Sequence, residues 1–422
     1  MKAVAAVLPF RVNAYVLDEL IDWDAVPDDP MYQLTFPQPG MLEGSDLASL
    51  MDLVRAGDSK ALRQRAAEIQ RTLNPHPAGQ LAHNRPGALR GLQHKYRETV
   101  LFFPKQGQTC HSYCSYCFRW AQFVGIEELR FDNGEPSQLA EYVRAHPAVT
   151  SVLFTGGDPL VMKAQVLRRY IEPLLEIEQL RSIRLGTKSL AYWPQRFLTD
   201  SDADELSRLF EDVVGANKNL ALMAHYSHWR ELETPVARAA LRRVLSAGAT
   251  VRTQAPLVRH VNDSPAVWRR LWQDQVQLGA VPYYLFVERD TGAKRYFEVP
   301  LARALEIYET AFREVSGLAR TARGPVMSAM PGKVLIDGVT NIAGERVFVL
   351  KLIQARDPSW ANRPFFARFD PNARWLHELK PALGRSQWFW ERPLAHMLEK
   401  SPATQPEAGK IALSTFGPHD AE

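Results

Sequence analysis

From Thr99 onward, short apolar runs alternate with longer stretches in which apolar residues recur at helical spacing. The runs, rich in β-branched and aromatic residues, are TVLFFP (99–104), VTSVLFTGG (149–157), SIRLGTKS (182–189), NLALMAHYSH (219–228), TVRTQAPLV (250–258) and YYLFVERD (283–290). Strands that alternate with helices favour right-handed βαβ units and a parallel sheet. The pattern predicts six such units.

The flanking regions follow other patterns. Residues 1–94 contain helical segments separated by Pro and Gly, with an extended patch at MYQLTFPQPG (31–40), and predict a mainly helical N-terminal domain. Residues 95–335 form the α/β part, 336–400 a C-terminal extension, and 401–422 a polar tail that we expect to be mobile. The expected fold class is α/β: a partial (β/α)6 TIM-like barrel with an N-terminal helical domain and a C-terminal extension.

Composition places the chain among folded proteins and argues against several classes. Hydrophobic residues make up 46% and charged residues 23% of 422, which is close to the globular average. No apolar run approaches the roughly 20 residues that span a bilayer, so neither a membrane segment nor a signal peptide is expected. The net charge of +4 comes from Lys and Arg scattered among acids, which does not indicate nucleic acid. Three cysteines are too few for a disulfide framework and favour a reducing cytoplasm.

All three cysteines lie within eight residues, in CHSYCSYC (110–117). At C-x3-C-x2-C spacing, Cys110, Cys114 and Cys117 can each bind a different iron of a [4Fe–4S] cluster. The fourth iron then keeps an open position for the amino and carboxylate groups of a small molecule, which favours catalysis over electron transfer. Two alternatives are a zinc site, for which His111 is poorly placed as fourth ligand, and three unrelated buried cysteines.

The stretch CHSYCSYCFRW followed by LFTGGDPL resembles the signature of radical S-adenosylmethionine enzymes and, more narrowly, the lysine 2,3-aminomutase family. The likeness continues in order from DDPMYQLTFPQ to MPGKVLIDG. It implies a radical S-adenosylmethionine barrel in which the reduced cluster transfers one electron to the bound sulfonium. A 5′-deoxyadenosyl radical then abstracts a substrate hydrogen.

The stretch TGGD follows the second predicted strand. Its residues are Thr155, Gly156, Gly157 and Asp158. Two glycines at a strand end let the backbone approach a ligand closely, and a carboxylate can accept from an ammonium, although an ordinary Gly-Gly-Asp turn has the same sequence. Positions matching His225 and Gln254 face the nucleoside or the substrate in the family. Each could instead be a satisfied polar group of the core.

The resemblance also implies pyridoxal phosphate, whose imine lets nitrogen migrate between neighbouring carbons. Lys333 in MPGKV matches the family's Schiff-base lysine, although the preceding glycine run is shortened to Gly332 and an exposed surface lysine is a plainer explanation. The family's two arginines before the first strand correspond to Lys95 and Thr99, with Arg97 close by. Lysine can bind a phosphate as a point charge, without the bidentate fork of arginine.

The substrate-binding positions are partly changed. Arg119 matches the residue that binds the substrate carboxylate, whereas two acids that bind the distal ammonium of lysine are replaced by Arg289 and Ser328. A guanidinium there would repel free lysine and favours an acidic or neutral polar side chain, unless Glu288 or Asp290 neutralises it. A shift of one residue would put Asp290 in the acid's place and reverse the argument.

Together these features predict an isomerase, a radical S-adenosylmethionine amino acid 2,3-aminomutase that moves an amino group between C2 and C3. Two alternatives are a radical enzyme on the same scaffold without pyridoxal phosphate, and an enzyme that modifies a lysine residue of a partner protein. The expected partners are an amino acid substrate, an electron donor such as flavodoxin or ferredoxin, and further copies of the chain in a homo-oligomer. No nucleic acid or membrane partner is expected.

Overall fold

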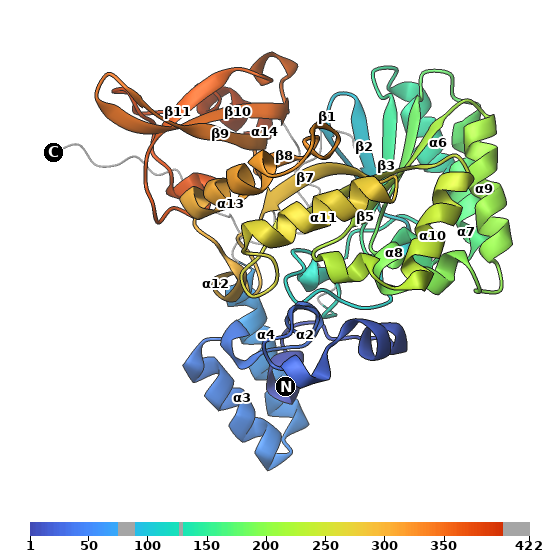
Figure 1. Cartoon of the computed structure of the whole chain (residues 1–422), viewed down its shortest axis with the longest axis horizontal. Coiled ribbons are helices and arrows are strands. Elements are labelled where there is room, and N and C mark those ends of the chain that lie inside the picture. The colour runs from blue at the N-terminus through green and yellow to red at the C-terminus, as the bar shows by residue number, and fades with distance from the viewer. Residues whose placement is uncertain (75–88, 126–129, 400–422) are drawn as a thin grey trace.

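The computed structural model describes residues 1–74, 89–125 and 130–399. In these residues one mixed sheet has eleven strands, and their order in space follows their order along the chain (Figure 1). The tail predicted to be mobile, 401–422, lies outside the described residues.

Seven neighbouring strands run parallel to one another. They are β2 (Thr99–Phe102), β3 (Ser151–Phe154), β4 (Ser182–Thr187), β5 (Asn219–His225), β6 (Thr250–Leu257), β7 (Val281–Val287) and β8 (Arg323–Ser328). Thr99 of β2 and Arg323 of β8 line one cavity, which shows that the sheet curls. Six βα units precede β8, so the predicted partial (β/α)6 barrel is confirmed.

Helices connect the parallel strands and cover the outer face of the barrel (Figure 1). The longer ones are α6 (Pro136–Ala145), α7 (Ala164–Leu175), α9 (Ala203–Gly215), α10 (Pro235–Ser246), α11 (Pro265–Gln277) and α13 (Leu301–Arg313), with short α8 (Ser189–Tyr192) and α12 (Lys294–Phe297). In β4, Ile183 and Leu185 are buried beneath these helices, whereas Ser182 and Arg184 line the interior. This alternation follows from the two-residue repeat of a strand.

The region before the barrel is mainly helical, as predicted. It contains α1 (Lys2–Ala5), α2 (Pro30–Thr35), α3 (Gly44–Ala56) and α4 (Ser59–Leu73), with a π-helical turn at Val16–Leu20. The extended patch predicted at 31–40 was wrong. Asp29 caps α2 by accepting from the backbone N–H of Tyr32 at 2.8 Å, and Pro30 takes the first helical position, which has no N–H to satisfy.

A strand that the sequence pattern did not predict, β1 (Leu92–Tyr96), pairs antiparallel with β2. The predicted boundary between residues 94 and 95 therefore falls inside β1. Another edge of the barrel continues from β8 into β9 (Gly332–Ile342), so the predicted boundary at 335 also falls inside a strand. Both flanking regions are continuous with the barrel sheet.

The C-terminal extension adds an antiparallel ladder of β9, β10 (Glu345–Ala355) and β11 (Pro364–Arg368), followed by α14 (Glu391–Glu399). Ala343 and Gly344 have φ angles of 50° and 82° between β9 and β10. Two successive positive φ angles are what a two-residue type I′ hairpin turn requires. A separate apolar core lies under this ladder and includes Trp360, Trp375, Trp388 and Trp390.

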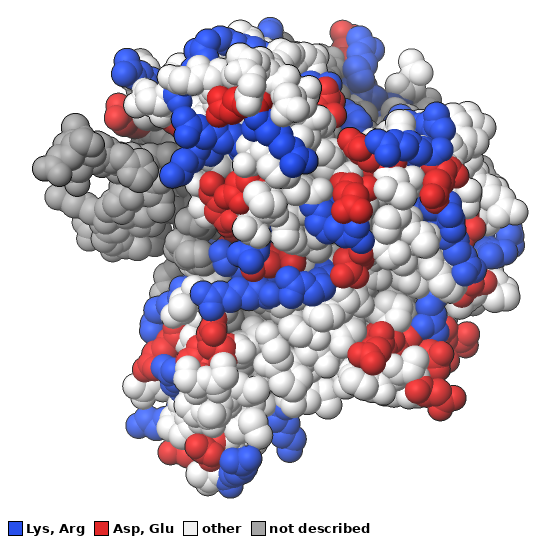
Figure 2. Space-filling view, turned by 60° about the vertical axis from the view of Figure 1, so that its left-hand side comes forward, with Lys and Arg blue, Asp and Glu red and all other residues white. Residues whose placement is uncertain are grey.

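The surface charge and the helices bear on the expected partners. On the face drawn in Figure 2, Lys and Arg side chains lie among Asp and Glu side chains, as the scattered charges of the sequence indicate. None of the helices in the described part of the chain combines the length and the apolar character needed to cross a bilayer.

Candidate active site

The residues predicted from sequence gather at the carboxyl ends of the barrel strands. The cysteine loop follows β2, the TGGD stretch follows β3, His225 ends β5, Arg289 follows β7 and Ser328 ends β8. Gln254 lies in β6 directly beside His225. This end of a parallel barrel is where catalytic groups collect.

Cys110, Cys114 and Cys117 lie in one loop, partly exposed and without disulfides. Burial is the main cause of the raised pKa of Cys110, and the carboxylate of Asp158 and the thiols of Cys117 and Cys114 add to it. Among the described residues, no three His, Cys, Asp or Glu side chains could hold a single metal ion. A [4Fe–4S] cluster gives each thiolate a separate iron and does not require convergence on one ion. The donor set fits such a cluster with one iron open to a ligand.

The N-terminal helical region contacts the cysteine loop directly. Arg11 Nη1 donates to Thr109 Oγ1 at 2.7 Å and to the carbonyl of Cys110 at 3.1 Å. The hydroxyl of Ser115 donates to the carbonyl of Gln33 at 2.7 Å. The region is therefore part of the site, a role that the sequence did not indicate because these partners lie far apart along the chain.

The glycines of TGGD allow a close approach within the chain itself. A side chain at Gly157 would clash with the backbone of Thr109, immediately before Cys110, and Gly156 has a φ of 127° that favours glycine. The N–H of Asp158 donates to the carbonyl of Thr109 at 2.7 Å. The turn that follows β3 and begins at Thr155 thus packs on the base of the cysteine loop. The expected contact of this stretch with a cofactor stays a prediction.

Asp158 is 3% exposed, and its carboxylate accepts several hydrogen bonds from the chain. The donors are the hydroxyls of Thr187 at 2.8 Å and Ser189 at 2.9 Å and the backbone N–H groups of Lys188 at 2.8 Å and Leu160 at 2.9 Å. These bonds join the ends of β3 and β4. Both oxygens of the Asp158 carboxylate accept hydrogen bonds from the chain itself, without an ammonium. Its role toward a cofactor stays a prediction. The sequence did not predict its structural role.

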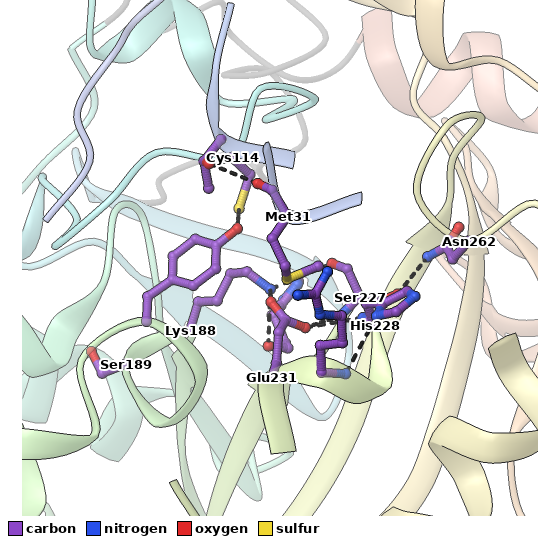
Figure 3. Close-up of polar contacts among 12 residues, drawn as sticks. Met31, Cys114, Lys188, Ser189, Ser227, His228, Glu231 and Asn262 are labelled. Carbon is purple, nitrogen blue, oxygen red and sulfur yellow. Dashed lines mark hydrogen bonds and ion pairs between the residues drawn. The ribbon is translucent and has the colours of Figure 1, made fainter. Parts of the chain in front are cut away.

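A buried ion pair beside the cysteine loop was also missed (Figure 3). Lys188 Nζ lies 2.6 Å from Glu231 Oε1, and the Glu231 side chain is completely buried. The other Glu231 oxygen accepts from the backbone N–H groups of Ser227 at 2.5 Å and His228 at 3.0 Å. A fully bonded pair of this kind fixes the loops after β4 and β5 relative to each other.

Tyr192 connects this ion pair to the cysteine loop. Its ring centre lies 4.5 Å from Lys188 Nζ, and its hydroxyl lies 3.7 Å from the sulfur of Cys114. Figure 3 shows Cys114 above Lys188 and Glu231. The stretch IRLGTKS contains Lys188, but the sequence gave no indication that its partner would be Glu231 from the loop after β5.

His225 and Gln254 are brought together, as their positions at neighbouring strand ends suggested. The amide nitrogen of Gln254 lies 2.9 Å from Nε2 of His225 and donates to it. Burial, with a smaller effect of Lys188, lowers the pKa of His225 to about 3, so the imidazole is neutral near pH 7. The pair offers a polar surface at the carboxyl ends of β5 and β6 without adding charge.

Two guanidinium groups flank one aromatic ring. The carbon Cζ of Arg119 lies 4.9 Å from the ring centre of Phe118, and Cζ of Arg289 lies 5.4 Å from the same centre. Arg119 also lies 4.5 Å from the ring centre of Phe103. Burial lowers the pKa of Arg119 to about 10, and Arg289 contributes to the same shift.

Both neighbours of Arg289, Asp290 and Glu288, raise the pKa of its guanidinium, although burial lowers that pKa overall. Burial raises the pKa of Glu288 well above its usual range, which disfavours its charged form. Asp290 also lies 3.7 Å from Nδ1 of His377. The Nε of Arg289 is buried without a hydrogen-bond partner. Arg289 thus lies beside the same ring as Arg119, with two acidic neighbours that act on its charge.

Lys333 lies at the start of β9, opposite Ser328 of β8. Its Nζ is 4.7 Å from the ring centre of Tyr284 and 6.0 Å from that of Tyr96. Burial, with smaller effects of two nearby arginines, lowers the pKa of Lys333 to about 7. Lys333 is half-buried, so the alternative of an exposed surface lysine is wrong, and an amine of low pKa fits a carbonyl cofactor.

Lys95 approaches the same region from β1. Its amine donates to the carbonyl of Ala329, which follows β8, and so joins the two edges of the barrel. Burial lowers the pKa of Lys95, and Arg356, Arg289 and Lys333 lower it further. Several cations thus gather at this edge.

A partial (β/α)6 barrel with a C-x3-C-x2-C loop at the carboxyl ends of its strands defines the class of radical S-adenosylmethionine enzymes. No family model matches the chain. It is 31% identical over 382 residues to an Aquifex aeolicus protein named "Putative L-lysine 2,3-aminomutase", covering 90% of this chain and 89% of that protein. The chain therefore belongs to the lysine 2,3-aminomutase family, whose members are isomerases.

Other relatives match over shorter lengths. The L-lysine 2,3-aminomutase of Fusobacterium nucleatum is 29% identical over 229 residues, which cover 54% of this chain and 51% of that enzyme. The enzyme of the same name from Haemophilus influenzae is 29% identical over 256 residues, 60% of this chain and 72% of that enzyme. Among solved structures, Streptococcus suis SuiB bound to precursor peptide SuiA has a TM-score of 0.37 at 12% identity, over 63% of this chain and 56% of that one.

Proposed function

We propose that this protein is a pyridoxal-phosphate-dependent amino acid 2,3-aminomutase whose substrate has an acidic side chain. The observation that carries the proposal is the half-buried, low-pKa amine of Lys333, which lies at the barrel end that also holds the cysteine loop.

The residues of the chain take distinct parts in this proposal. Cys110, Cys114 and Cys117 bind the cluster and leave one iron open, and Lys333 supplies the amine that attaches pyridoxal phosphate. The bound cofactors supply the radical and a π system through which nitrogen can move. Arg119 binds the α-carboxylate, for which a guanidinium is the natural bidentate partner.

The charge at Arg289 determines which charge the side chain of the substrate can carry. Two like charges 4 Å apart repel by about 4 kcal/mol at the effective dielectric constant of a protein surface. An ammonium beside Arg289 would meet this repulsion to the extent that Asp290 and Glu288 leave the guanidinium charge uncompensated, and burial disfavours the charged form of Glu288. A carboxylate, such as that of glutamate or aspartate, would be attracted instead.

The test uses the anaerobically reconstituted and reduced enzyme with S-adenosylmethionine and pyridoxal phosphate. We expect β-isomers of an acidic amino acid when a mixture of amino acids is supplied and the products are separated by mass spectrometry. Failure to isomerise any free amino acid would overturn the proposal and favour the modification of a protein-bound lysine. The electron donor, a homo-oligomeric assembly and a cytoplasmic location remain predictions.

A further inference from the structure

A second basic site lies at the opposite, amino end of the barrel strands. A cavity of about 470 Å³ is lined by residues from all seven parallel strands. Thr99, Ser151, Ser182 and Asn219, the first residues of four consecutive strands, face it. Side chains this small leave the lumen open where larger residues would fill a barrel core.

Three arginines line this cavity: Arg184, Arg252 and Arg323. Cζ of Arg323 lies 4.5 Å from the ring centre of Tyr283, and Cζ of Arg252 lies 5.4 Å from it. The Nε of Arg184 is buried without a hydrogen-bond partner.

No carboxylate among residues 1–74, 89–125 and 130–399 forms an ion pair with any of the three arginines, although the structure has many other ion pairs. Arg184 and Arg323 are half-buried and Arg252 is exposed, and guanidinium groups that line one cavity repel one another unless an anion joins them. A carboxylate would satisfy one guanidinium, whereas a phosphate monoester carries a charge of about −1.5 to −2 and three acceptor oxygens. Three guanidinium groups offer more hydrogen-bond donors than one carboxylate can accept, which favours a phosphate as the ligand.

We propose that this cavity binds the phosphate group of a phosphate monoester through Arg184, Arg252 and Arg323. One source of that group is pyridoxal phosphate, and this part of the proposal rests on the proposed function. Arg323 and Lys333 lie on the same tyrosine, because Cζ of Arg323 is 4.4 Å and Nζ of Lys333 is 4.7 Å from the ring centre of Tyr284. An aldehyde at Lys333 could therefore place its phosphate among the arginines. The other source is a free phosphate compound.

The position of Thr99 supports this assignment. Thr99 is a small residue that lines the cavity and carries no guanidinium group of its own. The guanidinium groups of Arg184, Arg252 and Arg323 come instead from β4, β6 and β8. The hydrogen-bond donors available to a phosphate in this cavity thus come from three different strands.

The experiment measures the dissociation constants of pyridoxal phosphate, pyridoxal and inorganic phosphate with the full chain carrying its reconstituted cluster. The variants are Arg252→Ala, Arg323→Ala and the double variant. Arg181→Ala, which removes an exposed charge next to β4 and outside the cavity, is the matched control. Each cavity substitution should weaken binding of the phosphate compounds about ten- to hundred-fold, and Arg252→Ala, which does not act on the pKa of Lys333, should leave pyridoxal unchanged. Arg323→Lys, which keeps the charge, should recover part of the affinity if the fold is intact.

Competition identifies the source of the phosphate. Displacement of pyridoxal phosphate by inorganic phosphate would place the cofactor's phosphate in the cavity, and arginine-dependent binding of inorganic phosphate without displacement would assign a separate phosphate site. Unchanged affinities for both phosphate compounds in the double variant would overturn the proposal. A wild-type enzyme that binds phosphate through these arginines but forms no covalent adduct with pyridoxal at Lys333 would overturn the proposed function alone.

Discussion

The ε-amine of Lys333 lies 4.7 Å from the ring centre of Tyr284, at the edge where β8 turns into β9. An amine in water has a pKa near 10.4, whereas burial brings that of Lys333 to about 7. A substantial neutral fraction at physiological pH makes it a nucleophile for an aldehyde. This contact connects the geometry of the barrel to the proposed chemistry.

Replacing Lys333 with Ala should abolish isomerisation, because the amine that attaches the cofactor is lost. Iron content and slow cleavage of S-adenosylmethionine should remain, since the cysteine loop lies on another strand. Borohydride reduction followed by peptide mass spectrometry measures the adduct directly. Lys351→Ala, a lysine of the adjacent strand β10 paired with Asp337, is the control and should keep both activities. A pyridoxyl group on another lysine in the wild type would contradict the assignment.

The rate of adduct formation with pyridoxal should increase with pH and level off above the pKa of Lys333, about 7. The direction follows because only the neutral amine attacks, and deprotonation increases as pH rises. Arg323→Ala should shift the profile to higher pH, because the nearby guanidinium lowers the pKa of the amine. A profile still rising above about pH 9 in the wild type would show an ordinary exposed lysine.

Substitution of any one of Cys110, Cys114 or Cys117 with Ala should remove the cluster or its activity, because each sulfur binds a separate iron. The chain has no further cysteine to take the place of the lost ligand. Iron and sulfide analysis together with S-adenosylmethionine cleavage measure the effect. Full iron content with undiminished cleavage in one variant would exclude that cysteine as a ligand.

Arg289→Asp should reverse the charge preference for the substrate, whereas Arg289→Lys should retain part of it. A charge-assisted hydrogen bond is worth about 1.5–3 kcal/mol, a ten- to hundred-fold change in apparent affinity. Competition between glutamate, aspartate and lysine in each variant measures the preference. Asp290→Asn serves as the control, and a loss of substrate selectivity there but not at Arg289 would place Asp290 in the site.

Glu231→Gln should destabilise the protein strongly, because it leaves the buried cation of Lys188 without its partner. Breaking a buried pair in this way costs about 3–5 kcal/mol of the free energy of unfolding. Glu233→Gln, which removes the exposed pair with Arg270, should cost less than about 1 kcal/mol. Denaturant titrations of both variants provide the comparison, and equal small losses would show that the Lys188 pair adds little.

The barrel could be predicted because its strands are short apolar runs separated by amphipathic helices, a signal carried by neighbouring residues. The cysteine loop was equally local, since all three thiols lie within eight residues. By contrast, the contact of Arg11 with Thr109 and the pair of Lys188 with Glu231 join residues whose proximity depends on the finished fold.

For polar residues at strand ends, too, the sequence does not predict which distant residues become their partners in the fold. The stretch TGGD was recognised, but its sequence does not reveal that Thr187 and Ser189 already occupy the carboxylate of Asp158. The basic cavity was not predicted, because Arg184, Arg252 and Arg323 come from three separate strands and meet only when the sheet curls.

The most direct test of the central claim is the transfer of deuterium from substrate to 5′-deoxyadenosine. The reduced enzyme is given glutamate, aspartate or lysine deuterated at C3, and the nucleoside and amino acid products are measured by mass spectrometry. The account predicts deuterium in 5′-deoxyadenosine and a β-amino acid from an acidic substrate, with the isomer absent in Lys333→Ala. Deuterium transfer from lysine alone, or from none of the three, would contradict it.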